Sequence, residues 1–126
     1  ASVDVDLLVH PEDVGHAVGV FSERGYRVDP EVTPGVGHHA THMSAPGRVP
    51  VEIHWTLWGT DPELTWNIIS RETEIRELMG DRVEIPNEAA RCLLIVLHAA
   101  HHGACEEPAL TDLQRAIVIA APLGRR

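Results

Sequence analysis

The chain contains no lysine, because all ten of its basic residues are arginine. This absence excludes a P-loop phosphate site and Schiff-base chemistry, since both need a lysine amine. Arginine is also outnumbered by acidic residues, and the formal net charge at pH 7 is −9. A surface of this charge repels the phosphates of a polynucleotide. We therefore expect no direct binding of DNA or RNA.

Cysteine and long hydrophobic runs are scarce as well. The two cysteines, Cys92 and Cys105, are not in the C-x-x-C spacing of a zinc or redox motif. No apolar run approaches the roughly 20 residues of a membrane span, and no segment reads as a signal peptide. From these features we expect a cytoplasmic protein that makes no membrane contact.

Hydrophobic residues make up 44% of the chain, enough for a globular domain with a packed core. Their periodicity and the turn residues between them predict the secondary structure. Strands are predicted at about residues 3–9, 26–32, 38–44, 49–58 and 82–85. Helices are predicted at about 11–24, from 62 onward, at 86–102 and at 108–121. The segment Glu72–Met79 is highly charged, and its pattern does not decide its structure.

The order of these elements is strands with one early crossover helix, followed mainly by helices. This order is typical of an α+β fold. We expect a small mixed β-sheet packed against helices, with a helical C-terminal part. Residues 1–58 would form the sheet region and residues 59–126 the mainly helical region of one compact domain.

Two aspartates, Asp4 and Asp6, lie two positions apart on the first predicted strand. Side chains alternate between the two faces of a strand, so both carboxylates point the same way. Glu52 lies on the polar face of the strand at 49–58. If the two strands are neighbours, the three carboxylates converge, and such oxygen ligands suit Mg²⁺ with phosphate oxygens as further ligands. The alternative is a solvated sheet face with scattered acids.

The chain has nine histidines, and four of them have positions of interest. His54 is on the same strand face as Glu52, where it either contacts substrate or a site carboxylate, or is simply a half-exposed strand histidine. His98, His101 and His102 can share one helical face. They either contact a substrate or its phosphates, or stabilise the C-terminal end of their helix. A transition-metal site is a third reading of these three residues.

Several short segments occur in a characteristic order. They are DVDLLV (residues 4–9), RGY (24–26), VEIHW (51–55), LHAAHHG (97–103) and TDL (111–113). Together they resemble the uncharacterised nucleotidyltransferase-like family of the DNA polymerase β superfold, over nearly the whole chain. The resemblance implies a small mixed sheet that carries the carboxylates and is backed by helices.

The resemblance also implies roles for individual residues. Asp4 and Asp6 match the paired aspartates that bind Mg²⁺ (or Mn²⁺) and the triphosphate, and Glu52 matches the third carboxylate, which holds the catalytic metal. His54, His98 and His102 are the candidate substrate contacts. The family has a glycine-containing turn before its DxD strand, and this sequence starts directly at that strand. We therefore expect an N-terminally truncated member.

Two functional hypotheses follow. The first is metal-dependent transfer of a nucleoside monophosphate from an NTP to a hydroxyl group of a small molecule or a protein. The second is a catalytically inactive or truncated member of the same fold that serves as a binding or interaction module. The first hypothesis predicts stabilisation by ATP with Mg²⁺ or Mn²⁺ that is lost in Asp4→Asn, and a Lys-Gly or Gly-Ser turn upstream of the first strand would count against the second.

Overall fold

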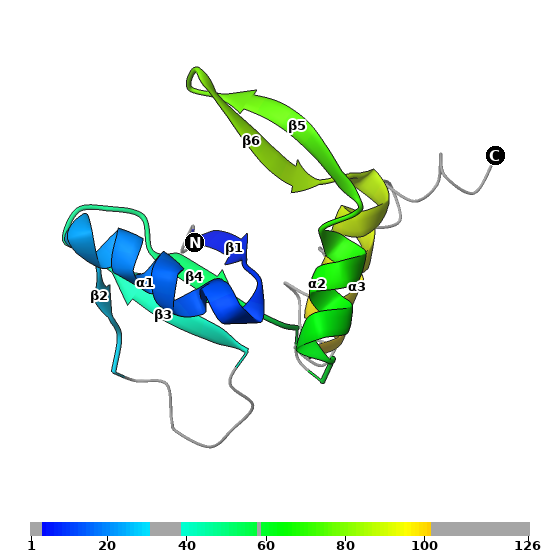
Figure 1. The fold of residues 1–126 in the computed structure, drawn as a ribbon, viewed down its shortest axis with the longest axis horizontal. Coiled ribbons are helices and arrows are strands. Elements are labelled where there is room, and N and C mark those ends of the chain that lie inside the picture. The colour runs from blue at the N-terminus through cyan, green and yellow to red at the C-terminus, as the bar shows by residue number, and fades with distance from the viewer. Residues whose placement is uncertain (1–3, 31–38, 58, 102–126) are drawn as a thin grey trace. The chain divides into compact units, whose positions relative to one another are not determined.

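The structure is a computed structural model that describes residues 4–30, 39–57 and 59–101 (Figure 1). The elements in chain order are β1 (Val5–Leu8), a 3-10 turn η1 (Pro11–Asp13), α1 (Val14–Glu23), β2 (Arg27–Val28), β3 (Ala40–Ser44), β4 (Val51–His54), α2 (Pro62–Ile69), β5 (Thr73–Leu78), β6 (Asp81–Pro86) and α3 (Glu88–His101). The chain divides into two compact units, Ala1–Trp66 and Asn67–Arg126.

The first unit contains a four-stranded sheet with the strand order β1-β4-β3-β2. β1 and β4 are parallel, whereas β4–β3 and β3–β2 are antiparallel. The sheet is therefore mixed, and the predicted α+β fold is confirmed. A turn at residues 45–48 lies between the antiparallel strands β3 and β4, and in it Gly47 has a φ of +69°.

The core of this unit lies on one face of the sheet. Met43, Val51 and Ile53 are buried there, and apolar side chains of α1 such as Val18 and Phe21 pack against them. Figure 1 shows α1 lying along the sheet. Side chains alternate along β4, and Val51 and Ile53 are buried on one face. Glu52 and His54 therefore lie on the opposite face.

Helices α2 and α3 each begin with a side-chain cap. The carboxylate of Asp61 accepts a hydrogen bond from the backbone N–H of Leu64 at 2.8 Å. The side chain of Asn87 accepts one from the backbone N–H of Ala90 at 2.9 Å. Each bond satisfies an N–H group that the first turn of a helix leaves without a backbone partner.

The second unit contains a strand that the sequence pattern did not reveal. β5 pairs with β6 in an antiparallel hairpin, with Leu78 opposite Asp81. The two residues between them have positive φ angles, 53° at Met79 and 90° at Gly80. A two-residue turn with two positive φ angles matches the twist of a hairpin. Methionine is an unusual residue at such a position, which explains why the turn was not recognised.

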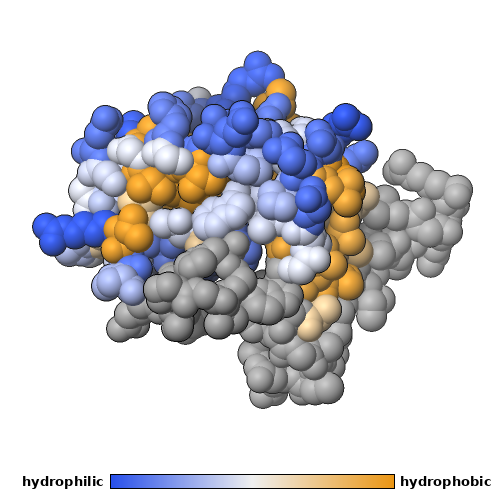
Figure 2. Space-filling model, turned by 60° about the horizontal axis from the view of Figure 1, so that its bottom comes forward, coloured by the Kyte–Doolittle hydropathy of each residue, from blue (hydrophilic) through white to orange (hydrophobic). Residues whose placement is uncertain are grey.

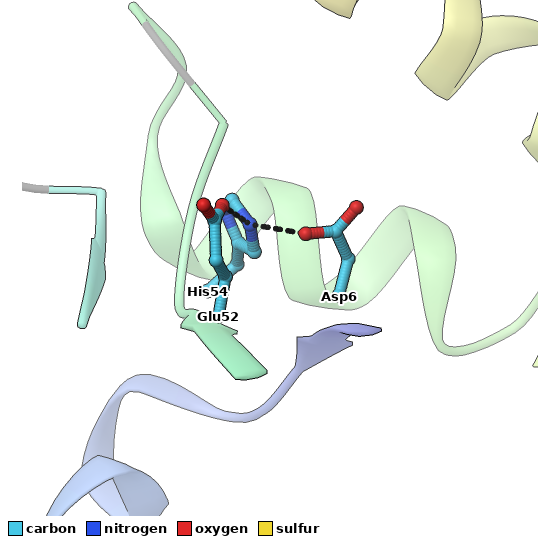
Figure 3. A group of neighbouring side chains, drawn as sticks. All are labelled: Asp6, Glu52 and His54. Atoms are coloured by element: carbon cyan, nitrogen blue, oxygen red, sulfur yellow. Dashed lines mark hydrogen bonds and ion pairs between the residues drawn. The ribbon is translucent and has the colours of Figure 1, made fainter. Parts of the chain in front are cut away.

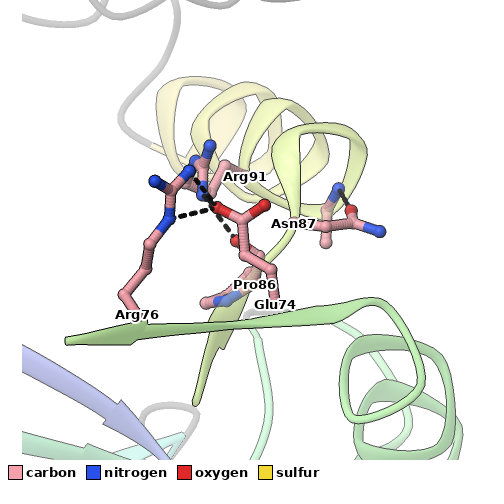
Figure 4. A network of polar contacts seen from close by, with 6 residues as sticks. Glu74, Arg76, Pro86, Asn87 and Arg91 are labelled. Carbon is pink, nitrogen blue, oxygen red and sulfur yellow. Dashed lines mark hydrogen bonds and ion pairs between the residues drawn. The ribbon is translucent and has the colours of Figure 1, made fainter. Parts of the chain in front are cut away.

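The hairpin is connected to α3 by a polar network (Figure 4). The Glu74 carboxylate accepts hydrogen bonds from Arg91 at 2.9 Å and from Arg76 at 2.8 Å. Arg91 also donates to the carbonyl of Pro86 at 2.8 Å. The guanidinium groups of Arg91 and Arg76 lower the pKa of Glu74 below its ordinary value. Arg91 thus contacts both strands of the hairpin from α3.

The predicted helix at 108–121 lies outside the described residues. Within the part of the chain that the structure describes, no helix is both long enough and apolar enough to cross a lipid bilayer.

Candidate functional site

The site lies on the sheet face opposite α1, where β1 and β4 run side by side. Their parallel register places Asp6 directly beside Glu52 and Leu8 beside His54. Neighbouring residues of paired strands point to the same face. The two acids therefore share one face, while Leu7 and Ile53 face the core.

His54 connects the two carboxylates (Figure 3). Its Nε2 atom lies 3.2 Å from Oδ1 of Asp6 and 3.2 Å from Oε2 of Glu52. The His54 side chain is only 16% exposed, and Glu52 is 23% exposed. One ring nitrogen thus faces two acidic oxygens in a partly buried setting, where electrostatic interactions are stronger than in bulk water.

The two carboxylates determine the protonation of His54. Burial by itself lowers the pKa of an imidazole, but hydrogen bonds and charge interactions from Asp6 and Glu52 outweigh it and raise the pKa of His54 above its ordinary value. The Nδ1 atom is buried, and no described group forms a hydrogen bond with it. It is therefore Nε2 that interacts with the acids.

A second histidine contacts Glu52 from the other side. Nδ1 of His42 lies 2.8 Å from Oε1 of Glu52, and the register of β3 on β4 places the two residues opposite each other. His42 is not among the site residues predicted from the sequence. Its signal was the hairpin turn after β3, because the register counted from that turn pairs residue 42 with residue 52.

The other predicted site residues are placed less centrally or lie beyond the described part. Asp4 is exposed and comes just before the first residue of β1. His98 belongs to α3, but its side chain and the whole of His102 lie outside the described residues.

Asp6, Glu52 and His54 form a group that could hold a metal ion. Each offers one ligand atom, and these atoms all lie within 4.8 Å of one another. Two carboxylate oxygens and an imidazole nitrogen are common ligands of divalent cations in proteins. Among the described residues, Asp4 does not belong to this group, so it is Asp6 that pairs with Glu52.

Comparison with known proteins decides the family. A family model described as an uncharacterised nucleotidyltransferase matches residues 2–117. The chain belongs to this family. The resemblance inferred from the short motifs is thereby confirmed. No curated protein and no solved structure gives a significant match.

Membership in this nucleotidyltransferase family indicates a nucleotidyltransferase-like role with a nucleotide as substrate. Nucleotidyltransferases generally use divalent metals, and the group formed by Asp6, Glu52 and His54 offers suitable ligands. The family's motif segments DVDLLV and VEIHW contain β1 and β4, the two strands that carry this group.

Proposed function

We propose that the protein is a metal-dependent nucleotidyltransferase that transfers a nucleoside monophosphate from an NTP to a hydroxyl group of a small molecule or a protein. The observation that supports this proposal most strongly is the pairing of Asp6 with Glu52 on adjacent parallel strands, in a chain that belongs to a nucleotidyltransferase family.

The residues at this position fit a divalent cation. Asp6 and Glu52 supply carboxylate oxygens within reach of one ion, the hard ligands that Mg²⁺ and Mn²⁺ accept. Asp4, exposed immediately before the same strand, is the third carboxylate that we assign to the site. A bound cation offsets phosphate charge and makes an acceptor hydroxyl more acidic.

The transfer step is a substitution at phosphorus. The oxygen of the acceptor hydroxyl forms a bond to the α-phosphorus of the NTP, and the bond from that phosphorus to the oxygen bridging to the β-phosphate breaks. Pyrophosphate leaves with the electron pair of the broken bond. We assign uptake of the hydroxyl proton to the Glu52 carboxylate, which is ionised when it holds a cation.

The negative charge of the chain disfavours a polynucleotide as the acceptor of the nucleoside monophosphate. With a formal net charge of −9 and no lysine, the protein does not attract a polyanionic acceptor over a long range. Hydrophilic residues cover much of the described surface on the face drawn in Figure 2. A small molecule or a protein that presents a hydroxyl group is compatible with this surface.

Thermal unfolding with and without ligands tests the proposal. With Mg²⁺ or Mn²⁺ and ATP present, we expect the melting temperature of the wild type to rise, because ligands that bind only the folded state stabilise it by about 2.7 kcal/mol at a hundredfold excess over Kd. The rise should be lost in Asp6→Asn and reduced in Asp4→Asn.

Asp81→Asn is the matched control, because Asp81 is an exposed aspartate of β6 and should leave the rise unchanged. Given an NTP labelled at the α-phosphate and a panel of hydroxyl acceptors, the wild type and Asp81→Asn should release pyrophosphate and transfer the label, and Asp6→Asn should do neither. Equal ligand-induced shifts in the wild type and in Asp6→Asn would contradict the proposal. A shift that needs Asp6 but comes without any transfer would favour a binding module.

A further inference from the structure

The group that can hold a metal contains a nitrogen atom as well as two oxygens. We propose that Nε2 of His54 is the third protein ligand of the cation held by Asp6 and Glu52, and that this mixed set makes the site prefer a first-row transition-metal ion such as Mn²⁺ over Mg²⁺. This inference deepens the proposed function and rests on it.

The direction of the His54 ring supports the assignment. Nε2 is 3.2 Å from one oxygen of each acid, Asp6 Oδ1 and Glu52 Oε2 (Figure 3). A ring nitrogen that donates a hydrogen bond in one direction presents its lone pair in that same direction when the proton sits on the other nitrogen. The lone pair of Nε2 is therefore aimed at the space that the two carboxylates border.

The strand backbone places the ligand atoms of Asp6, Glu52 and His54 close together before any cation binds. Glu52 and His54 are two residues apart on β4 and so share a face, and Asp6 is the register partner of Glu52 on β1. With only 16% of its side chain exposed, His54 has little room to turn away. Ligands that are already in place lose little conformational freedom when a cation binds.

Neighbouring side chains restrict the ligands further. His42 Nδ1 lies 2.8 Å from Oε1 of Glu52, so Oε2 is the oxygen turned toward His54. The ring of His39 lies 5.6 Å from that of His54, measured between centroids. Such surrounding contacts orient metal ligands in proteins and raise metal affinity.

The kind of donor decides which ion is preferred. Mg²⁺ is a hard cation that binds oxygen ligands in a strict octahedral arrangement, whereas transition-metal ions, including Mn²⁺ with its preference for oxygen, accept an imidazole nitrogen more readily than Mg²⁺ does. A site with two carboxylate oxygens and one imidazole nitrogen therefore gains more from Mn²⁺ than from Mg²⁺. Mn²⁺ is also the suitable probe, because its unpaired electrons report directly on nitrogen ligands.

The experiment uses the whole chain, purified without a polyhistidine tag so that no added histidine binds the probe. Mn²⁺ affinity is measured by electron paramagnetic resonance titration, and Mg²⁺ affinity by competition. Electron spin echo modulation of the Mn²⁺ complex detects a coordinated nitrogen. Two variants remove the nitrogen in different ways: His54→Gln places an amide oxygen at a similar distance, and His54→Ala removes the donor.

In the wild type we expect nitrogen modulation and about tenfold tighter binding of Mn²⁺ than of Mg²⁺. Both variants should lose the modulation and bind Mn²⁺ about tenfold more weakly, while His54→Gln retains most of its Mg²⁺ affinity. His16→Ala is the matched control, because His16 is an exposed histidine of α1, and it should behave as the wild type.

Absence of nitrogen modulation in the wild type overturns the inference without reference to any variant. Unchanged Mn²⁺ affinity and modulation in a folded His54→Gln also overturn it. In either case, loss of Mn²⁺ binding in Asp6→Asn leaves the proposed metal-dependent function standing. If Asp6→Asn binds Mn²⁺ as tightly as the wild type, the inference and the metal site of the proposed function both fail.

Discussion

Glu52 is held by a different histidine at each of its two carboxylate oxygens. His42 contacts Oε1 at 2.8 Å and His54 contacts Oε2 at 3.2 Å. A carboxylate fixed in this way keeps Oε2 directed toward His54, which also contacts Asp6, instead of rotating freely. His42 and His54 therefore influence both the orientation of the Glu52 carboxylate and the charge of the site.

The first prediction concerns His42. His42→Ala should weaken Mn²⁺ binding by about tenfold, because loss of a partner that orients a ligand typically reduces metal affinity by that order. Isothermal titration calorimetry measures the effect, with His16→Ala as a control that should not change the Kd. An unchanged Kd in His42→Ala would mean that Glu52 is held in place without His42.

The second prediction concerns His54 in metal-free protein. Because its pKa is raised in the folded state, protonated His54 stabilises the fold. This contribution is fully present below the ordinary pKa of 6.5 and is lost as the pH rises through the higher pKa of the folded state.

Chemical denaturation in the presence of a chelator, at about pH 5.5 and about pH 9, measures this contribution. The wild type should exceed His54→Gln in free energy of unfolding by more at the lower pH than at the higher one. A difference between the two proteins that is constant, or that grows with pH, would contradict the sign of the shift.

At the scale of elements, two strand pairs determine the architecture in different ways. β1 and β4 are far apart in sequence, and their parallel pairing brings the acids together. β5 and β6 are joined by a two-residue turn. In that turn Met79 has a φ of 53°, a left-handed conformation that is unfavourable for most side chains by about 1–2 kcal/mol.

The third prediction follows from this turn. Met79→Asn should raise the free energy of unfolding by about 0.5–1 kcal/mol, because asparagine tolerates a positive φ and Met79, which is 98% exposed, contributes little packing. Urea denaturation measures the change. Met79→Leu is the control for side-chain size and should have no such effect. A lower free energy of unfolding in Met79→Asn would show that the positive φ of Met79 does not reduce the stability of the protein.

At the scale of the whole molecule, charge is the dominant property. A formal net charge of −9, with arginine as the one basic residue type besides histidine, disfavours contact with the phosphate backbone of nucleic acids. Asp6 and Glu52 place part of this negative charge side by side at the candidate site. Under the proposed function, a bound cation would offset the charge of these acids and of the nucleotide phosphates.

The fourth prediction is that the protein does not bind polynucleotides. Fluorescence anisotropy with labelled single-stranded RNA or duplex DNA should show no saturable binding up to about 100 μM protein at about 50 mM salt, a condition that favours nonspecific binding. The measurement is repeated with Mg²⁺. Micromolar binding in either condition would contradict the expectation and would reopen a polynucleotide as the acceptor.

Much of the local structure was predictable from the sequence. The strands around Asp6 and Glu52, the helix starts at Asp61 and Asn87 and the α+β class follow from periodicity and capping residues, which act over a few positions. β5 was not predictable, because its charged sequence shows no decisive pattern and its turn contains methionine in place of asparagine or aspartate.

The sequence by itself determined which side chains share a face of each strand, because alternation is a property of the strand alone. It also determined the family, through motifs read in order. Only the tertiary structure decided that β1 lies beside β4 with Asp6 opposite Glu52, and that His42 and His54 contact the same carboxylate. Strand pairing and register depend on residues far apart in the chain, so no local pattern specifies them.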